Sequence, residues 1–171
     1  MFAYIMCGPI GSGKSHVAKT LYGHLPQLNP DDLMPKGEWT REKSNAAWDE
    51  IHRRIEAMVG IGLEFVVDSA QALQVSRRRL TQYIRQVAPS YKIVCVFVNT
   101  PYKKCARNNR LRDRVVPEDK LKEYYDNVMN SPPSRDDGYD EVIVVNNALY
   151  SGNYGEVWKS EKPWPEGWYH V

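Results

Sequence analysis

Short apolar runs alternate with amphipathic stretches along this chain, and the alternation predicts its secondary structure. An apolar run bounded by turn residues is typical of a buried strand, and apolar residues that recur every three or four positions are typical of a helix. The predicted strands cover residues 2–7, 25–28, 63–67, 91–98 and 142–145. The predicted helices cover residues 15–24, 40–60, 74–88, 101–110 and 117–130. Strands that alternate with helices predict an α/β domain with a mostly parallel sheet.

A glycine-rich stretch between the first strand and the first helix carries a specific chemical signal. Residues 8–15 read GPIGSGKS, which fits the phosphate-binding pattern G-x-x-x-x-G-K-[ST] at every fixed position. Glycines let successive backbone N–H groups surround a phosphate, and the helix that follows adds the positive end of its dipole. The pattern therefore predicts ATP binding, with Lys14 on the β- and γ-phosphates and the Ser15 hydroxyl on Mg²⁺. The predicted ATP-binding residues of this loop are Gly8, Gly11, Ser12, Gly13, Lys14 and Ser15.

Carboxylates follow two of the other predicted strands. Asp31 and Asp32 come directly after the short second strand, and Asp68 ends the third. Ligands of open α/β sheets bind at the carboxyl ends of the strands, so Asp31 and Asp32 are candidates for a ligand site, and Asp68 resembles the metal-associated aspartate of phosphate-loop enzymes. Asn, Pro and Asp also form turns and helix caps, which leaves a purely structural role open for each.

Two clusters of arginine stand out against an otherwise balanced charge. Arg107, Arg110, Arg112 and Arg114 lie within eight residues, and in a nucleotide enzyme they suggest a lid that stabilises the transferring phosphoryl group. The alternative is a solvated basic helix end that is partly paired with nearby acidic residues. The second cluster, residues 77–79, is most simply a solvated helix face, although a polyanionic substrate could also use it.

Length and composition are those of an ordinary globular domain. The chain has 171 residues, 42% of them hydrophobic and 26% charged, and its formal net charge of +2 is too small to indicate nucleic-acid binding by itself. The three cysteines lack metal-ligand spacing, and no apolar run reaches membrane-spanning length, so we expect a cytoplasmic protein with no membrane partner. Residues 1–146 are predicted to form the domain, and the aromatic-rich residues 147–171 an irregular tail packed on it.

Taken together, several motifs resemble the kinase domain of phage-type polynucleotide 5′-hydroxyl kinases. The resemblance extends over roughly residues 3–145 and rests on residues 8–15, 29–32, 66–68, 105–110, 116–117 and 138–142. It implies a P-loop kinase fold, ATP and Mg²⁺ as cofactors, and a polynucleotide 5′ end as partner. It also implies that Asp31 is the general base and that Asp68 stands beside the substrate end. Arg110 matches the lid motif best as the arginine on the transferring phosphates, with Arg112 and Arg114 as competitors.

The sequence departs from this family around the acceptor. Met34 stands where the family has an arginine associated with substrate phosphate binding, and residues 69–70 read Ser-Ala in place of Thr-Asn. Lys36, Arg41 or Arg77 could supply the missing charge. We therefore expect transfer of the γ-phosphate of ATP to a hydroxyl, most simply a polynucleotide 5′-hydroxyl. A small acceptor such as a nucleoside, nucleotide, sugar or antibiotic is the alternative, and an ATPase or nucleotide switch without an acceptor is a further one.

Overall fold

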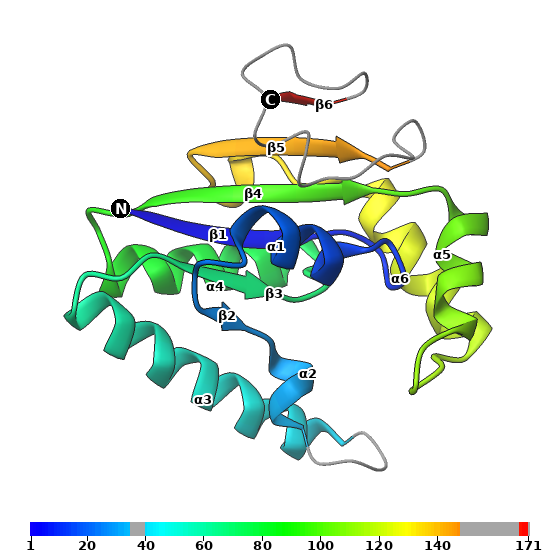
Figure 1. Ribbon diagram of the computed structural model, residues 1–171, viewed down its shortest axis with the longest axis horizontal. Coiled ribbons are helices and arrows are strands. Elements are labelled where there is room, and N and C mark those ends of the chain that lie inside the picture. Colours follow the sequence, from blue (N-terminus) through cyan, green and yellow to red (C-terminus); the bar gives the residue numbers. More distant parts are fainter. Residues whose placement is uncertain (35–39, 148–167, 171) are drawn as a thin grey trace.

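A parallel sheet forms the centre of the molecule (Figure 1). The structure, a computed structural model, describes residues 1–34 and 40–147 and the backbone of residues 168–170. The strand order is β2-β3-β1-β4-β5-β6, and the first five of these strands run parallel. The strands are β1 (Phe2–Cys7), β2 (Gln27–Leu28), β3 (Phe65–Asp68), β4 (Lys92–Asn99), β5 (Glu141–Asn146) and β6 (Trp168–His170).

Helices cover both faces of the sheet, which is why its central strands are apolar almost throughout. The helices are α1 (Lys14–Tyr22), α2 (Pro30–Leu33), α3 (Arg41–Gly60), α4 (Gln74–Val87), α5 (Tyr102–Arg110) and α6 (Glu118–Asn130), with a 3₁₀-helix, η1, at Arg135–Asp137. Alternate residues of β1 face opposite cores. Met6 packs with Val17 and Leu21 of α1, whereas Ile5 lies in the larger core with residues of α3, α4 and α6. In Figure 1, α1 lies in front of the sheet and α4 behind it.

The predicted strands and helices are present, with ends that differ from the prediction by two residues at most. The expected turn after the second strand contains the short helix α2, whose first turn is capped by Asn29. The prediction of an irregular tail was wrong for residues 168–170, because they form β6 and pair antiparallel with β5. β5 is the last of the parallel strands, and the backbone groups on its outer side pair with β6, which becomes the edge strand. Residues 148–167 lie outside the described part of the chain.

Arg77 departs from the expected solvated helix face. Its side chain is 0% exposed and forms an ion pair with Asp137 at 2.6 Å, whereas Arg78 and Arg79 are exposed as expected. A buried arginine requires a buried partner, and Asp137 provides one from η1, far along the chain. The three cysteines are buried and free. None of the helices in residues 1–34 and 40–147 has the length and apolar character that a membrane crossing needs.

Candidate active site

A pocket of about 240 Å³ lies at the carboxyl ends of β1, β2 and β3. This is the edge at which α/β sheets bind ligands, because loops from neighbouring strands converge there. Four parts of the chain form its wall: the loop 8–15, the start of α2, the segment after β3, and the end of α5 with the residues that follow. The lining residues are Ile10, Gly11, Gly13, Lys14, Ser15, His16, Asn29, Asp31, Asp68, Ser69, Ala70, Asn108 and Arg112.

The glycines of the phosphate loop (residues 8–15) hold backbone conformations that other residues adopt only at a cost. Gly11 has φ +77° and Gly13 has φ +95°, both in the left-handed region. A Cβ on Gly11 would lie 2.4 Å from the carbonyl oxygen of Cys105, so the loop also packs directly against the backbone of α5. At Gly13, which precedes α1, the nearest atom to such a Cβ is an amide nitrogen of Asn147 at 3.5 Å.

Side chains from distant segments hold the carbonyl groups of the phosphate loop. The Ser12 carbonyl accepts hydrogen bonds from Thr100 Oγ1 and Asn147 Nδ2, both at 2.9 Å. The Gly11 carbonyl accepts one from Asn108 Nδ2 at 2.8 Å. A helix leaves the N–H groups of its first turn without intrahelical partners, and α1 begins at Lys14. With its carbonyls held by these side chains, the loop has N–H groups available for an anion.

Charged groups on both sides of the loop alter one another's ionisation. Burial lowers the pKa of the Lys14 ammonium, and the nearby Asp68 carboxylate opposes this change. The ammonium donates a hydrogen bond to the Pro9 carbonyl at 2.8 Å, which holds it across the loop. Burial also raises the pKa of Asp68, and the Ser15 side chain and Lys14 oppose that rise. Lys14, Ser15 and Asp68 therefore form one electrostatically linked group at the bottom of the pocket.

The two carboxylates after β2 lie in different environments. Asn29 caps α2 by accepting a hydrogen bond from the Asp31 N–H at 2.9 Å, so among the residues 29–32 the helix cap is Asn29. Asp31 lines the pocket with its side chain 65% exposed. Asp32 is exposed on α2 and lies outside the residues that line the pocket within the described chain. Of the pair, Asp31 is therefore the one that lines the pocket.

One of the four clustered arginines reaches the pocket. Arg112 lines it and places Nη2 3.9 Å from Asp31 Oδ2. Arg107, Arg110 and Arg114 are exposed, and in the described part of the chain none of them belongs to the pocket wall. The motif match favoured Arg110, whereas the structure brings Arg112 to the pocket.

The sequence also matches a known family. A family model described as an AAA domain covers residues 4–130. The chain belongs to this family. Its mostly parallel sheet, flanked by helices, confirms the predicted P-loop kinase fold. No curated protein matches this AAA domain.

Solved structures of similar fold carry several different functions. A sugar kinase from Janibacter sp. HTCC2649 has a TM-score of 0.63 and 14% identity, and the match covers 91% of each chain. The Deinococcus radiodurans tunicamycin resistance protein has a TM-score of 0.59 and 15% identity, over 92% of this chain and 91% of its own. A chain of the Pnkp1/Rnl/Hen1 RNA repair complex has a TM-score of 0.65 and 14% identity, over 75% of this chain and 44% of its own length. At such identities the likeness shows a shared fold.

The residues of the AAA domain fit a polyphosphate and a hard divalent cation. The phosphate loop combines left-handed glycines, the N-terminus of α1 and the Lys14 ammonium, and the buried Ser12 Oγ has no hydrogen-bond partner among the described residues. Mg²⁺ in phosphate sites is held by one or two protein oxygens together with phosphate and water, and Ser15 and Asp68 supply such oxygens side by side.

Sequence reasoning missed the residues that hold the site together. Asn108 contacts the phosphate loop, and Asn109 forms two hydrogen bonds with the backbone of Val116, at 2.8 and 3.1 Å. The second pair closes the segment between α5 and α6, the segment that contains Arg112. Both asparagines lie inside the 105–110 motif, so the motif could have drawn attention to them. Thr100 and Asn147 gave no local signal, because their contacts to Ser12 span 88 and 135 residues.

Proposed function

We propose that this AAA domain is an ATP-dependent phosphotransferase that moves the γ-phosphate of ATP to a hydroxyl group. The observation that carries the proposal is the placement of Asp31 in the same pocket as Lys14 and Ser15. A phosphate loop alone is compatible with hydrolysis or with simple binding, whereas a carboxylate across the pocket from the loop can receive an acceptor. Proteins named as kinases share the fold, which supports the same class of reaction.

Each residue has a role that its position allows. Lys14 and the backbone N–H groups of the phosphate loop would hold the β- and γ-phosphates and stabilise charge during transfer. Asp31 would accept the proton of the acceptor hydroxyl, and Arg112, whose guanidinium lies 3.9 Å from Asp31, would contact the phosphoryl group as it passes from ATP to the acceptor. Ser15 and Asp68 would hold Mg²⁺, which neutralises phosphate charge when bound. The protein's contribution is therefore mainly orientation and fixed charge.

For the acceptor we propose a polynucleotide 5′-hydroxyl, in keeping with the resemblance of motifs 29–32 and 105–110 to polynucleotide kinases. The shared fold of a chain in an RNA repair complex is compatible with this acceptor.

A specific observation favours a small hydroxyl compound as the second candidate. Met34 stands where the resembling family has an arginine. Arg77, which could have replaced that positive charge, is buried against Asp137. Arg41 remains exposed at the start of α3, and Lys36 lies outside the described residues. Apart from Arg112, the wall near Asp31 is formed by neutral groups such as Asn29 and Ser69 and by the Asp68 carboxylate. A neutral acceptor suits such a wall better than a strand of phosphates does.

The deciding experiment follows labelled γ-phosphate from ATP in the presence of Mg²⁺. The acceptor panel contains 5′-hydroxyl DNA and RNA oligonucleotides, nucleosides, nucleoside monophosphates and simple sugars. Asp31→Asn should abolish transfer while ATP still binds, and Asp49→Asn, which alters an exposed carboxylate on α3, should transfer at the wild-type rate. Label on oligonucleotides would establish the first acceptor, and label on small compounds alone would establish the second. Release of phosphate by water without any labelled acceptor would refute the phosphotransferase proposal.

A further inference from the structure

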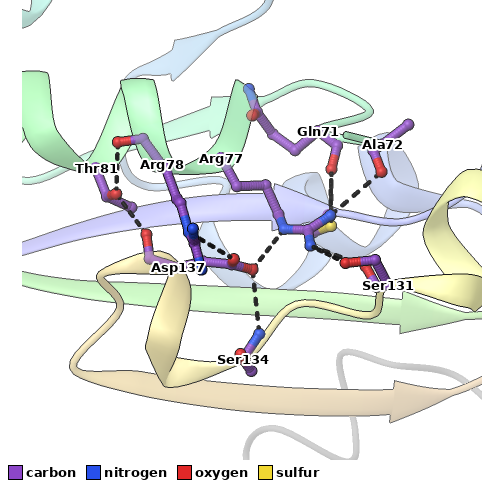
Figure 2. A network of polar contacts seen from close by, with 9 residues as sticks. Gln71, Ala72, Arg77, Arg78, Thr81, Ser131, Ser134 and Asp137 are labelled. Atoms are coloured by element: carbon purple, nitrogen blue, oxygen red, sulfur yellow. Dashed lines mark hydrogen bonds and ion pairs between the residues drawn. The ribbon is translucent and has the colours of Figure 1, made fainter. Parts of the chain in front are cut away.

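Arg77 lies in a buried network of polar contacts (Figure 2). Its guanidinium has five N–H groups, and all of them find acceptors. Nε donates to Asp137 Oδ2 at 2.6 Å, and Nη1 donates to the carbonyls of Gln71 and Ala72, both at 3.2 Å. Nη2 donates to the Ser131 carbonyl at 2.8 Å and to its hydroxyl at 3.3 Å. One side chain thus joins the segment after β3 to the end of α6 and to η1.

The segment that Arg77 holds leads directly to the pocket wall. Gln71 is a non-glycine residue at φ +47°, a conformation that persists only where its surroundings impose it. Its side-chain amide donates to Ser69 Oγ at 2.8 Å, and its carbonyl lies 3.5 Å from Cys7 Sγ. The carbonyl of Ala70 accepts a hydrogen bond from the N–H of Gly8, the first residue of the phosphate loop, at 3.2 Å. Ser69 and Ala70 both line the pocket.

Stability alone is a weak explanation for this network. Removing two opposite charges from water offsets most of their mutual attraction, so well-packed apolar residues can often replace a buried ion pair without loss of stability. Apolar replacements could not hold the Gln71 and Ala72 carbonyls, however, because these carbonyls accept hydrogen bonds from a side chain of α4. Only a planar guanidinium can donate hydrogen bonds to these two carbonyls, to Asp137 and to Ser131 at the same time.

We propose that Arg77 is a positioning residue for the acceptor side of the pocket. It fixes the carbonyls of Gln71 and Ala72, and these fix the left-handed turn that places Ser69 and Ala70 in the wall. This inference rests on the proposed phosphotransferase function, because it assigns the wall to the acceptor. The phosphate loop has its own supports in Thr100, Asn108 and Asn147, so nucleotide binding depends little on Arg77.

Two variants at Arg77 and a matched control test the proposal. Arg77→Lys keeps the charge beside Asp137 but lacks the planar fork, so it cannot hold both carbonyls and Ser131 at once. The double variant Arg77→Met/Asp137→Leu removes both charges and leaves no unpaired buried ion. Arg78→Lys is the control, because Arg78 is exposed and approaches the same Asp137 at 3.8 Å but forms no hydrogen bond with residues 69–72 in the described part of the chain.

We expect the Arg77 variants to lose activity toward the acceptor while they keep their affinity for the nucleotide. In both Arg77 variants, kcat/KM for the acceptor should fall about 10- to 100-fold, the scale of effect that small misplacements produce in oriented reactions. The Kd of a non-hydrolysable ATP analogue should stay within about threefold, and Arg78→Lys should match the wild type. Equal losses in nucleotide affinity and acceptor kcat/KM, or a loss of thermal stability alone, would overturn the proposal. So would failure of both variants to fold, because Arg77 would then support the fold as a whole.

Hydrogen–deuterium exchange gives a readout that needs no acceptor. Amides of residues 69–72 should exchange at least about tenfold faster in Arg77→Lys than in Arg78→Lys, because local opening is what the guanidinium opposes. Unchanged exchange there would overturn the positioning role. If the wild type phosphorylates nothing in the panel, the proposed function fails, and the exchange result still decides whether Arg77 holds this wall.

Discussion

Replacement of Gly11 by alanine tests whether the phosphate loop needs the conformation described above. The added Cβ would lie 2.4 Å from the Cys105 carbonyl oxygen, and real Cβ atoms essentially never approach other atoms within 3.0 Å. Relief therefore requires a movement of at least 0.6 Å between the loop and α5. The atoms in the way belong to the helix backbone, which yields less easily than a side chain. The left-handed φ of +77° adds a second penalty that no movement of α5 removes.

The size of the effect follows from these two terms. Alanine in the left-handed region costs about 1–2 kcal/mol, and overpacking a well-packed site typically costs about 1–3 kcal/mol. Together they amount to about 2–5 kcal/mol, which appears as a loss of folding stability, a loss of ATP affinity, or both. If the loop keeps its shape, the variant loses thermal stability. If the loop relaxes, ATP affinity falls, by about 30-fold to about 4,000-fold when the whole penalty appears on binding.

Calorimetric titration with a non-hydrolysable ATP analogue and Mg²⁺, together with thermal unfolding, measures both parts. The matched control is Gly60→Ala at the end of α3, where a Cβ would meet nothing within 4 Å. This control should bind the analogue with the wild-type Kd and gain up to about 1 kcal/mol of stability from helix propensity. A Gly11→Ala variant with unchanged melting temperature and with Kd within threefold of the wild type would refute the reasoning.

Two further predictions concern charge in the pocket. Because burial holds the pKa of Asp68 above its usual range, ionisation of this group lowers folding stability as the pH rises through its folded pKa. Asp68→Asn should therefore have a higher melting temperature than the wild type at pH 7 while losing phosphotransfer. This difference in melting temperature should vanish below the unfolded pKa of about 3.9. A lower melting temperature of the variant at pH 7 would contradict the prediction. Arg112→Ala should lower kcat at least about 10²-fold, whereas Arg110→Ala should lower it less than threefold, and steady-state kinetics with the reverse order would restore Arg110 as the acting arginine.

The sequence predicted the helices and strands well because their signals are local. A central parallel strand is apolar on both faces, so β4 is visible as an unbroken run from Ile93 to Val98. The phosphate loop is likewise a contiguous pattern, and its context of strand, loop and helix is present as expected. Strand β6 could not be predicted this way, because its pairing with β5 depends on a partner more than twenty residues away.

Arg77 shows how a long-range partner reverses a local interpretation. Three consecutive arginines look like a solvated surface, and the burial of the first depends on Asp137, sixty residues later. A helical signal was nevertheless present, because Arg77 shares the buried face of α4 with Leu80, Thr81 and Ile84 at spacings of three, four and seven. The charge of the cluster favoured a solvated position for Arg77, whereas its helical spacing favoured a buried one. The structure shows that Arg77 is buried.

The two halves of the pocket are encoded in the sequence in different ways. The nucleotide half is formed mainly by residues 8–16, so a single stretch of chain specifies it. The proposed acceptor half combines Asp31 after β2, Ser69 after β3 and Arg112 after α5, which follows β4; they meet only because β2, β3, β1 and β4 are neighbours in the sheet. A motif can therefore identify the phosphate donor, whereas the acceptor depends on where each of these segments is held. Because Arg77 holds one of them, a residue that touches no substrate can influence which acceptor the pocket takes.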